Sequence, residues 1–485
     1  MPSIATPPVG QDVSRVAAIG PAARGAAWTR VPRSALEGVG WPAIPTAANS
    51  RVLALLQQLE CSQWWTADRL QHHQLRQLER LLEHAYRANP FYRERLARAG
   101  YRAGDRVSPE LWQRIPVLDR DMVREHDREL RAAEIPKAHG ETSEHVTSGS
   151  TGRPLRIAKT GLDGLMWAAL TLREEVWHRR DLSLPLAAIR RDPSGQSEFP
   201  EGRRQETWGF PVGTMFPTGP GFQLDNLTTI EQQVDWLRRR NPAYLMTFPT
   251  VVAEIARTCR AHGIRLQDLR GIRTVGEVVD AGLRVICREV FGVEVVDLYS
   301  AVETGYLALQ CPEQKGYHVQ AEAVLVEVLD AGGALCGPGE VGTVVVTVLH
   351  NFAMPLIRFA IGDMAEVGAS CACGRGLPVI SRILGRSRDL VRLPSGDRRY
   401  ALLSFDQVLN RIPAVVQGQV VQKTVEDIEV RLVSRRPLSA EEEDAIRDRL
   451  IENFRYGFRV TFTYHRTIPR SAAGKFFDFL SELPT

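Results

Sequence analysis

TSGSTGRP, residues 147–154, is the stretch from which the fold of this chain is predicted. Its glycines allow a tight loop whose backbone N–H groups point at one anion, and the hydroxyl groups between them add donors that suit phosphate oxygens. The Gly-Lys-Ser/Thr ending of a Walker loop is absent. The stretch therefore predicts a phosphate-binding loop of another type. A plain Ser/Gly surface loop, which has the same composition, is the alternative.

A second group of polar residues follows the run VEVVDLYS, residues 293–300, which predicts a buried β-strand. Tyr299, Ser300 and Glu303 lie at its exit, where ligands bind in α/β sheets. An aromatic ring at this place can stack on a base, and a carboxylate can hold a Mg²⁺ ion that bridges phosphates. A strand end with one solvated glutamate is the simpler interpretation of the same residues.

Two later motifs each contain one charged candidate. In RFAIGD, residues 358–363, Asp363 follows a glycine and is suited to accept hydrogen bonds from a ribose diol; an ordinary turn has the same pattern. In PRSAAGK, residues 469–475, Lys475 lies on a predicted exposed loop. From there a lysine can swing into a cleft and stabilise a phosphoryl transition state, although most such lysines are simply solvated.

The remaining sequence indicates an α/β protein of more than one domain. Residues 1–50 are rich in Ala, Pro and Gly and lack sustained periodicity, which predicts a mobile or loosely docked leader. Residues 51–385 alternate β-rich runs with helical segments, which predicts a large α/β domain. Residues 386–485 are predicted to form a small α+β domain, and Ser439 with Glu442 gives its helix a capping box.

Composition excludes several classes of protein. The 485 residues are 44% hydrophobic and 24% charged, which is typical of a globular chain. The formal charge of +4 is not gathered into a stripe, so nucleic acid is not an expected partner. No apolar run is long enough to span a membrane, and the first residues lack a signal peptide, so a cytoplasmic location is expected. The seven cysteines are too few for a disulfide framework.

Taken in order, these motifs resemble the adenylate-forming superfamily of acyl-CoA ligases, adenylation domains and luciferases. The sequence is most similar to the phenylacetate-CoA ligase branch, which typically lacks a lysine after the loop proline; here Leu155 follows Pro154. That branch also begins with a helix similar to LLEHAYRANPFYRERL at residues 81–96. The resemblance implies an α/β adenylate-forming ligase fold, with a large N-terminal domain and a small, mobile C-terminal domain.

The resemblance also implies roles for individual residues. Asp363 would bind the ribose, Arg386 would help from the domain junction, and Glu303 would hold Mg²⁺. Lys475 would bridge the carboxylate and the α-phosphate during adenylation. The residues that would bind ATP or AMP are Thr147, Ser148, Gly149, Ser150, Thr151, Gly152, Gly276, Glu277, Tyr299, Ser300, Asp363 and Arg386. At the hinge, Arg388 replaces the usual acid, which leaves the hinge energetics and the thiol step open.

Four further residues form a candidate metal site. Cys311 and His318 lie about fifty residues before Cys371 and Cys373, and thiolates with imidazole are the preferred tetrahedral ligands of zinc. Buried thiols and an unrelated histidine are the alternative. Members of the phenylacetate-CoA ligase branch have a similar His/Cys cluster, and this resemblance implies a structural Zn²⁺ that takes no part in catalysis.

The implied activity has two steps, which are the activation of a carboxylic acid by ATP to an acyl-adenylate and transfer of the acyl group to coenzyme A. The acid is expected to be aryl or arylacetic, and Trp208, Phe210, Tyr244 and Phe248 are candidate pocket residues or plain core. Two alternatives stay open: transfer to a carrier-protein thiol or an amine, and a non-catalytic nucleotide-binding relative. The expected assembly is a monomer or a homodimer.

Overall fold

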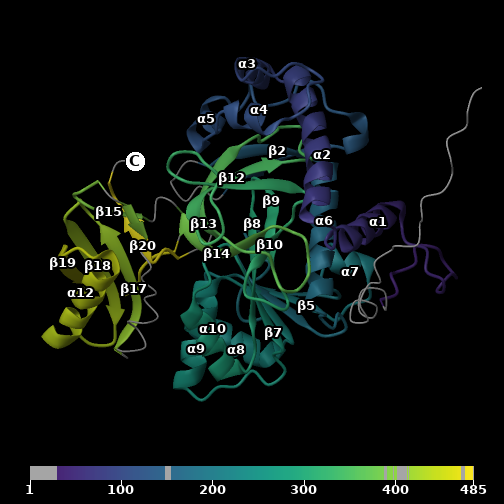
Figure 1. The fold of residues 1–485 in the computed structure, drawn as a ribbon. Helices are drawn as coiled ribbons and strands as arrows, with labels where there is room; N and C mark the ends of the chain where they lie inside the picture. Colours follow the sequence, from purple (N-terminus) through teal and green to yellow (C-terminus); the bar gives the residue numbers. More distant parts are fainter. Residues whose placement is uncertain are drawn as a thin grey trace, which may run out of the picture.

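The computed structural model describes residues 30–147, 154–386, 390–396, 398–400, 412, 414–470 and 476–483. Figure 1 shows a large unit and, beside it, a small unit drawn in yellow-green. Arg33 near the start of the described chain donates hydrogen bonds of 3.1 Å to the backbone oxygens of Gly213 and Phe216, so this segment docks on the large unit.

The large unit is built on a twelve-stranded sheet. Its central strands are parallel and its flanks are antiparallel. In order across the sheet the strands are β11 (Val324–Leu329), β12 (Val341–Val348), β13 (Phe359–Val367), β14 (Val379–Arg386), β10 (Tyr317–Val319), β9 (Gly305–Gln310), β8 (Val295–Ala301), β7 (Gly271–Val275), β6 (Tyr244–Thr247), β3 (Leu186–Ile189), β5 (Gly221–Leu224) and β4 (Arg203–Gln205).

Helices cover both faces of the parallel strands (Figure 1). Because successive strand residues point to opposite faces, Leu186 and Tyr244 pack in one core while Ala187 and Leu245 pack in the other. The helices of the large unit are α1 (Ala47–Ser62), α2 (Ala67–Ala88), α3 (Pro90–Arg98), α4 (Pro109–Arg114), α5 (Arg120–Glu125), α6 (Gly161–Trp177), α7 (Val212–Met215), α8 (Ile230–Arg240), α9 (Pro249–Ala261) and α10 (Ala281–Phe291), with a 3₁₀ turn at Lys137–His139.

Local sequence signals explain where several helices begin and end. From Leu70 onward, apolar residues recur at spacings of three and four and form the buried face of α2, in which Leu78 and Leu82 are fully buried. The helix stops at Asn89, because the residue before a proline is disfavoured in the α region. The side chain of Asn89 then accepts a hydrogen bond from the backbone N–H of Tyr92 and caps α3.

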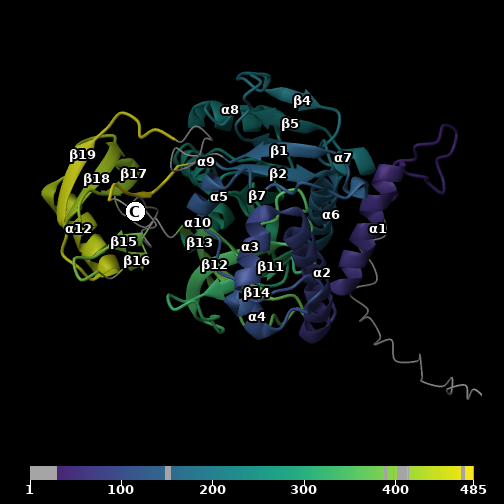
Figure 2. The same ribbon diagram turned by 90° about the horizontal axis from the view of Figure 1, so that it is seen from above.

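The loop predicted from TSGSTGRP joins two strands of a hairpin. β1 (Thr142–Val146) pairs with β2 (Arg156–Thr160) in antiparallel register, separately from the large sheet, and Figure 2 shows the two strands side by side. Residues 148–153, which contain most of the predicted phosphate loop, lie outside the described residues.

The small unit has a four-stranded sheet in the order β19 (Arg459–Tyr464), β18 (Asp427–Ser434), β17 (Val415–Gln422) and β20 (Phe479–Ser481). The helix α12 (Ala440–Phe454) packs on it through Ile446, Leu450 and Phe454. The predicted capping box is confirmed, since Ser439 and Glu442 exchange backbone-to-side-chain hydrogen bonds of 2.9 and 3.3 Å. β15 (Leu390–Arg392) and β16 (Arg398–Tyr400) form a separate two-stranded ladder in this unit.

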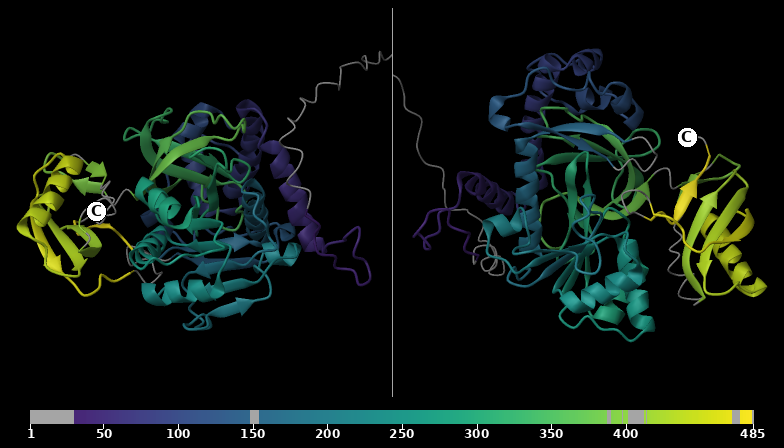
Figure 3. Two further views of the ribbon diagram at one scale, coloured as in Figure 1. Left: turned by 90° about the horizontal axis from the view of Figure 1, so that it is seen from below. Right: turned by 180° about the vertical axis from the view of Figure 1, so that it is seen from behind.

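Both views in Figure 3 show the small unit at one side of the large unit. No helix in the described part of the chain is long and apolar enough to cross a bilayer.

Candidate functional site

Two residues predicted from separate motifs meet at the exit of β8. The phenol of Tyr299 donates a hydrogen bond of 2.9 Å to Oδ2 of Asp363 on β13. Asp363 is therefore part of a strand and not of an ordinary turn, although Gly362 before it has a positive φ of 88°. Asp363 faces Arg386 of β14 in the antiparallel register. The ladder thus brings together three of the residues expected to bind the nucleotide.

Glu303 is buried and ion-paired, and is not the solvated glutamate of the simpler interpretation. Its side chain is 3% exposed, and Oε1 accepts a hydrogen bond of 2.7 Å from Nη1 of Arg120. Arg120 begins α5 after Asp119, whose carboxylate caps that helix. The same Nη1 donates to the backbone oxygen of Ile361 at 3.2 Å. Arg120 therefore links the Glu303 carboxylate to the strand that carries Asp363.

The base of the phosphate-loop hairpin lies near this carboxylate. Thr147 closes the hairpin, because its backbone N–H donates to the Leu155 oxygen and its Oγ1 accepts from the Leu155 N–H, both at 2.9 Å. Thr147 is buried, so its hydroxyl serves the backbone in this structure. On β2, burial lowers the pKa of Lys159, while the charges of Asp163 and Glu303 oppose that shift. A second cation is thus placed within electrostatic reach of Glu303.

Glu277 lies at the contact between the two units. Gly276 has a positive φ of 77° just after β7. Oε2 of Glu277 accepts hydrogen bonds of 3.0 and 2.9 Å from the backbone N–H and the hydroxyl of Thr250, at the start of α9. Oε1 accepts a hydrogen bond of 3.0 Å from the backbone N–H of Phe476. Burial raises the pKa of Glu277.

Arg470 of the small unit reinforces this contact. Its guanidinium donates to Oγ1 of Thr250 and pairs with Oε1 of Glu254, both at 3.0 Å. Lys475 lies between Arg470 and Phe476 in the sequence but outside the described residues. Six more of the residues named from the sequence lie outside the described residues: Ser148, Gly149, Ser150, Thr151, Gly152 and Arg388. Of Arg386, the structure describes the backbone and not the side chain.

A cavity of about 280 Å³ opens beside Ser300, between α6 and the parallel strands. Its walls carry six aromatic rings, which are Trp167, Trp208, Phe210, Phe222, Phe248 and Tyr306. Trp167 stacks on Phe210 and on Tyr306 with ring centroids 6.1 Å apart. Of the four aromatic residues considered from the sequence, Tyr244 alone is absent from the lining; it packs edge-on behind Trp208. The wall is suited to a flat apolar group.

The four predicted metal ligands converge. One ligand atom from each of Cys311, His318, Cys371 and Cys373 lies within 4.8 Å of the others. The Cys311 and Cys371 sulfurs are 3.8 Å apart, and the Cys373 sulfur is 3.3 Å from Nε2 of His318. Two thiolates bound to one zinc ion at about 2.3 Å and tetrahedral angles lie about 3.8 Å apart. The donor set and its spacing therefore fit a closed tetrahedral Zn²⁺ site.

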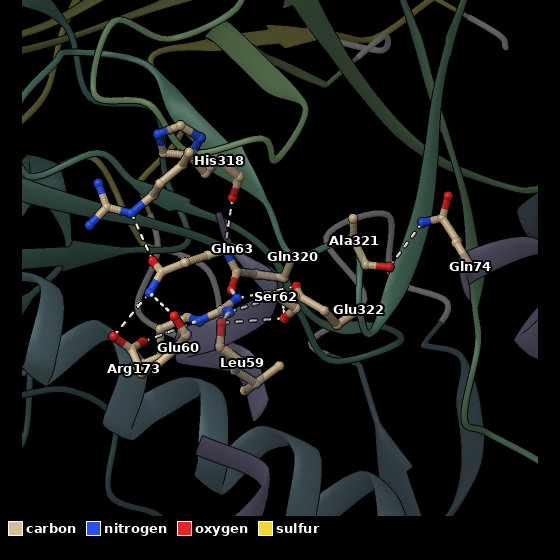
Figure 4. A network of polar contacts seen from close by, with 11 residues as sticks. Leu59, Glu60, Ser62, Gln63, Gln74, Arg173, His318, Gln320, Ala321 and Glu322 are labelled. Carbon is tan, nitrogen blue, oxygen red and sulfur yellow. Dashed lines mark hydrogen bonds and ion pairs between the residues drawn. The ribbon is translucent and has the colours of Figure 1, made fainter. Parts of the chain in front are cut away.

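Buried polar contacts tie this Cys/His cluster to the first helices. The side-chain amide of Gln320 donates to the backbone oxygen of His318 at 2.9 Å, and its oxygen accepts from Nη1 of Arg173 on α6 at 2.8 Å (Figure 4). Arg173 also pairs with Glu322 at 2.9 Å. Nearby, Nε of Arg375 donates a hydrogen bond of 2.8 Å to Oε1 of Gln63, the residue that follows α1. The cluster thus braces the helices against the sheet.

Sequence reasoning missed the cations that complete the site. Arg120 and Arg470 lie 183 and 220 positions from Glu303 and Thr250, their respective partners, so no local pattern joins them. Conversely, Arg358 of the RFAIGD motif is structural. It is 4% exposed and pairs with Glu327 at 3.0 Å, and it also donates to the backbone oxygens of Trp112 and Ile115 at the end of α4.

Comparison of the sequence with known proteins gives the following likenesses. Residues 397–480 match the CapK C-terminal domain family. A phenylacetate-coenzyme A ligase of Thermus thermophilus is 26% identical over 79% of this chain and 86% of its own length. A phenylacetate-coenzyme A ligase of Pseudomonas putida is 26% identical over 70% of this chain and 74% of its own.

Solved structures share the fold. A 2-hydroxyisobutyryl-CoA ligase in the postadenylation state has a TM-score of 0.65 at 18% identity, covering 84% of this chain and 89% of that one. The same ligase in the thioesterification state, with 2-HIB-AMP and CoA, has a TM-score of 0.56 at 19% identity, covering 87% and 91%. The expected fold, a large N-terminal α/β domain with a small C-terminal domain, is confirmed.

Proposed function

We propose that this chain converts an aryl or arylacetic acid to its coenzyme A thioester, because phenylacetate-coenzyme A ligases are about 26% identical to most of it and an acyl-CoA ligase shares its fold. One carboxylate oxygen attacks the α-phosphorus of ATP, the bond to the bridging oxygen breaks, and pyrophosphate leaves. The thiolate of coenzyme A then attacks the acyl carbonyl, and AMP leaves.

The observation that carries the proposal is the convergence of Glu303, Tyr299 and Asp363 near the end of β8. Asp363, with Arg386 opposite it, is assigned to the ribose hydroxyls, because a carboxylate accepts hydrogen bonds from both. Tyr299 holds the Asp363 carboxylate through its phenol, and its ring is assigned to the adenine. The loop at residues 148–153 is assigned to the phosphates.

Glu303 would hold Mg²⁺ together with phosphate oxygens. Oxygen ligands, carboxylates above all, are those that Mg²⁺ prefers, and a bound ion would neutralise charge on the phosphates. In the present structure Arg120 neutralises this carboxylate. Because Arg120 pairs with this carboxylate, it would compete with the ion for Glu303.

Lys475 is assigned the stabilisation of charge at the α-phosphate during adenylation. Its sequence neighbours on either side are attached to the large unit, Arg470 through Glu254 and Phe476 through Glu277. These attachments support a role for the Lys475 loop at the site. The thiol step requires this loop to withdraw, since one domain face serves each half-reaction.

The cysteine and histidine cluster is proposed to hold a structural Zn²⁺ ion. Its four ligands fill a tetrahedron, so no position is left for a substrate or a reacting water. When bound, the ion would fix the turn that contains Cys371 and Cys373 against β10.

Carboxylate-dependent exchange of label between pyrophosphate and ATP tests the adenylation step. Purified protein is assayed without coenzyme A against aryl, arylacetic and aliphatic acids, and we expect exchange with aromatic acids. In the same assay, Lys475→Ala should lower exchange by several orders of magnitude while the protein stays folded. No exchange with any acid, despite ATP binding, favours the non-catalytic alternative.

Addition of free coenzyme A identifies the acceptor. Consumption of its thiol with release of AMP supports the proposed ligase. Acyl-adenylate that accumulates beside unused coenzyme A favours a carrier-protein thiol or an amine as the acceptor.

A further inference from the structure

The aromatic cavity beside Ser300 runs across the sheet, away from the candidate nucleotide residues. Ser300 lines it on β8, next to Tyr299, and Arg190 lines it directly after β3. In the strand order β8-β7-β6-β3 these two places are three strand spacings apart, which corresponds to about 14 Å. One aromatic ring and one arginine side chain together span that distance. An acid whose carboxyl group lies near Ser300 therefore points the far end of its ring toward Arg190.

The far end of the cavity carries polar side chains that a bound molecule can reach. Arg190 is exposed and Gln223 is half-buried, so both keep accessible surface, and both line the cavity. Arg190 points to the same face of the sheet as Ala188, because the two are two residues apart. Gln223 on β5 is the partner of Ala188 in the parallel register. Gln223 is therefore a diagonal neighbour of Arg190, at a spacing that long side chains bridge.

The charge of Arg190 sets this end of the cavity apart. Within the described ranges, no acceptor takes a hydrogen bond from its guanidinium and no carboxylate forms an ion pair with it. Asp225, the residue after β5, pairs with Arg191 instead. Burial in the recess lowers the pKa of Arg190; the charge of Asp192 opposes that shift and the charge of Arg273 adds to it. A cation that is partly desolvated and repelled by another cation is stabilised most by an anion.

The donors at this end suit a carboxylate. A guanidinium presents parallel N–H groups that match the two oxygens of a carboxylate, and the side-chain amide of Gln223 adds two further N–H donors. A methyl group accepts no hydrogen bond from them. A nitro group has the shape of a carboxylate but no net charge, so the cation stabilises it less.

We propose that the cavity takes an aromatic carboxylic acid with a second carboxylate group, at the end of the ring remote from the reacting carboxyl group. Arg190 pairs with the second carboxylate, Gln223 donates a hydrogen bond to it, and the aromatic walls pack against the ring. This inference rests on the proposed function, since it names the substrate class of the same site. It separates this chain from an enzyme that prefers unsubstituted phenylacetate.

Matched acids test the inference on the unaltered protein. The 3- and 4-carboxyphenylacetates are compared with the 3- and 4-nitrophenylacetates, which have the same shape, and with phenylacetate. Calorimetry gives Kd in the presence of α,β-methylene-ATP, which cannot release pyrophosphate, and pyrophosphate exchange with ATP gives kcat/KM. One dicarboxylic acid should bind at least about tenfold more tightly than its nitro analogue, and its kcat/KM should rise in parallel. Equal or weaker binding of both dicarboxylic acids overturns the inference.

The two measurements separate this inference from the proposed function. Exchange without any preference for a second carboxylate overturns the inference and leaves the ligase proposal intact. Tighter binding of a dicarboxylic acid without exchange for any acid overturns the ligase proposal and leaves the selectivity intact. Absence of binding by every aromatic acid overturns both.

Variants assign the selectivity to one side chain. Arg190→Met removes the cation, so the nitro-to-carboxylate ratio of Kd values should approach one. Arg190→Lys keeps a positive charge without the paired N–H groups and should restore part of the ratio. Arg204→Met is the matched control, because it removes one positive charge from β4 at an exposed position outside the cavity lining. It should leave the ratio unchanged; a ratio that falls as far as in Arg190→Met contradicts the assignment to Arg190.

Discussion

The phenol of Tyr299 and the carboxylate of Asp363 are joined by a hydrogen bond of 2.9 Å, although 64 positions separate them in the chain. Tyr299 is at the end of the last parallel strand, and Asp363 is in the antiparallel flank. A register shift between Tyr299 and Ser300 accompanies the turn of the chain at this place. The two motifs therefore form one hydrogen-bonded pair at the candidate site.

Removal of this hydrogen bond should weaken ATP binding. Tyr299→Phe keeps the ring but leaves the carboxylate without its phenolic donor, so the KM for ATP should rise about 3- to 10-fold, as expected for one net hydrogen bond. Asp363→Ala should raise it by a larger factor, because the assigned ribose contacts are lost as well. Pyrophosphate exchange at varied ATP measures both; a smaller effect for Asp363→Ala than for Tyr299→Phe would contradict the ribose assignment.

The Arg120–Glu303 pair should stabilise the protein before nucleotide binds. Arg120→Met leaves a 3%-exposed carboxylate unpaired, so the free energy of unfolding should fall by about 1–3 kcal/mol. Because Arg120 competes with the metal for Glu303, less Mg²⁺ should half-saturate ATP binding in this variant. Urea unfolding and a Mg²⁺ titration measure the two effects. Arg128→Met provides a control from the same segment, with neither effect expected.

Zinc should copurify with the protein at about one ion per chain. The Cys371→Ser/Cys373→Ser double variant should lose the ion and melt at a lower temperature, since two of four ligands are removed. Cys61→Ser changes an exposed cysteine outside the cluster and should retain both metal and melting temperature. Elemental analysis beside calorimetry checks this prediction, and wild-type protein without stoichiometric metal contradicts it.

Arg470 should hold the small unit against α9 of the large unit. Arg470→Met removes contacts to Thr250 and Glu254, so pyrophosphate exchange should fall by roughly tenfold, the equivalent of about 1.4 kcal/mol. Small-angle X-ray scattering should show a larger radius of gyration. Arg466→Met, an exposed change on the same connection, is the control. If scattering and exchange both match the control, the contact does not hold the two units.

Asp297 should make stability depend on pH. This carboxyl is 2% exposed, and burial raises its pKa to about 7 against the hydrogen bonds that it accepts from Thr274 and Tyr317. The folded protein thus binds the proton more tightly than the unfolded chain does, and the free energy of unfolding should fall as pH rises from about 4 to about 7. The contribution is full at low pH and is lost above that range.

An Asp297→Asn variant removes this dependence. Because the wild type loses stability as pH rises and the variant does not, the free energy of unfolding of the variant minus that of the wild type should increase through the same pH range and then level off. Urea unfolding at intervals from pH 5 to pH 8 measures this difference. Asp235→Asn, at a half-exposed position, should keep the wild-type slope. A variant that tracks the wild type at every pH would show that Asp297 does not titrate in this window.

Elements set by neighbouring residues were predictable from the sequence. The capping box of Ser439 and Glu442 and the apolar stripe of α2 both depend on positions three or four apart, so the sequence displays them directly. The strand before Tyr299 was also predicted correctly, as β8. The order of the motifs indicated the superfamily, because several spaced signatures rarely coincide by chance.

Pairs of side chains that are distant in the chain could not be predicted from the sequence. Arg120 carries no signal that assigns it to Glu303, and Arg358, which belongs to a recognised motif, turned out to serve the core. The same holds for Arg273 and Glu175, which pair although they come from a strand and a helix 98 positions apart. Which charges meet depends on how helices pack on the sheet, and many sequences with the same local pattern would pair them differently.

The sequence by itself thus determined the fold class, the order of the candidate motifs and the four residues of the cysteine and histidine cluster. The tertiary structure decided that Tyr299 meets Asp363, that Glu303 is buried beside a cation, and that six aromatic rings gather around one cavity beside Ser300. The physical reason is the distance along the chain over which each interaction acts. Backbone propensity and capping act over a few residues, whereas burial and charge pairing are properties of side chains that only the folded chain brings together.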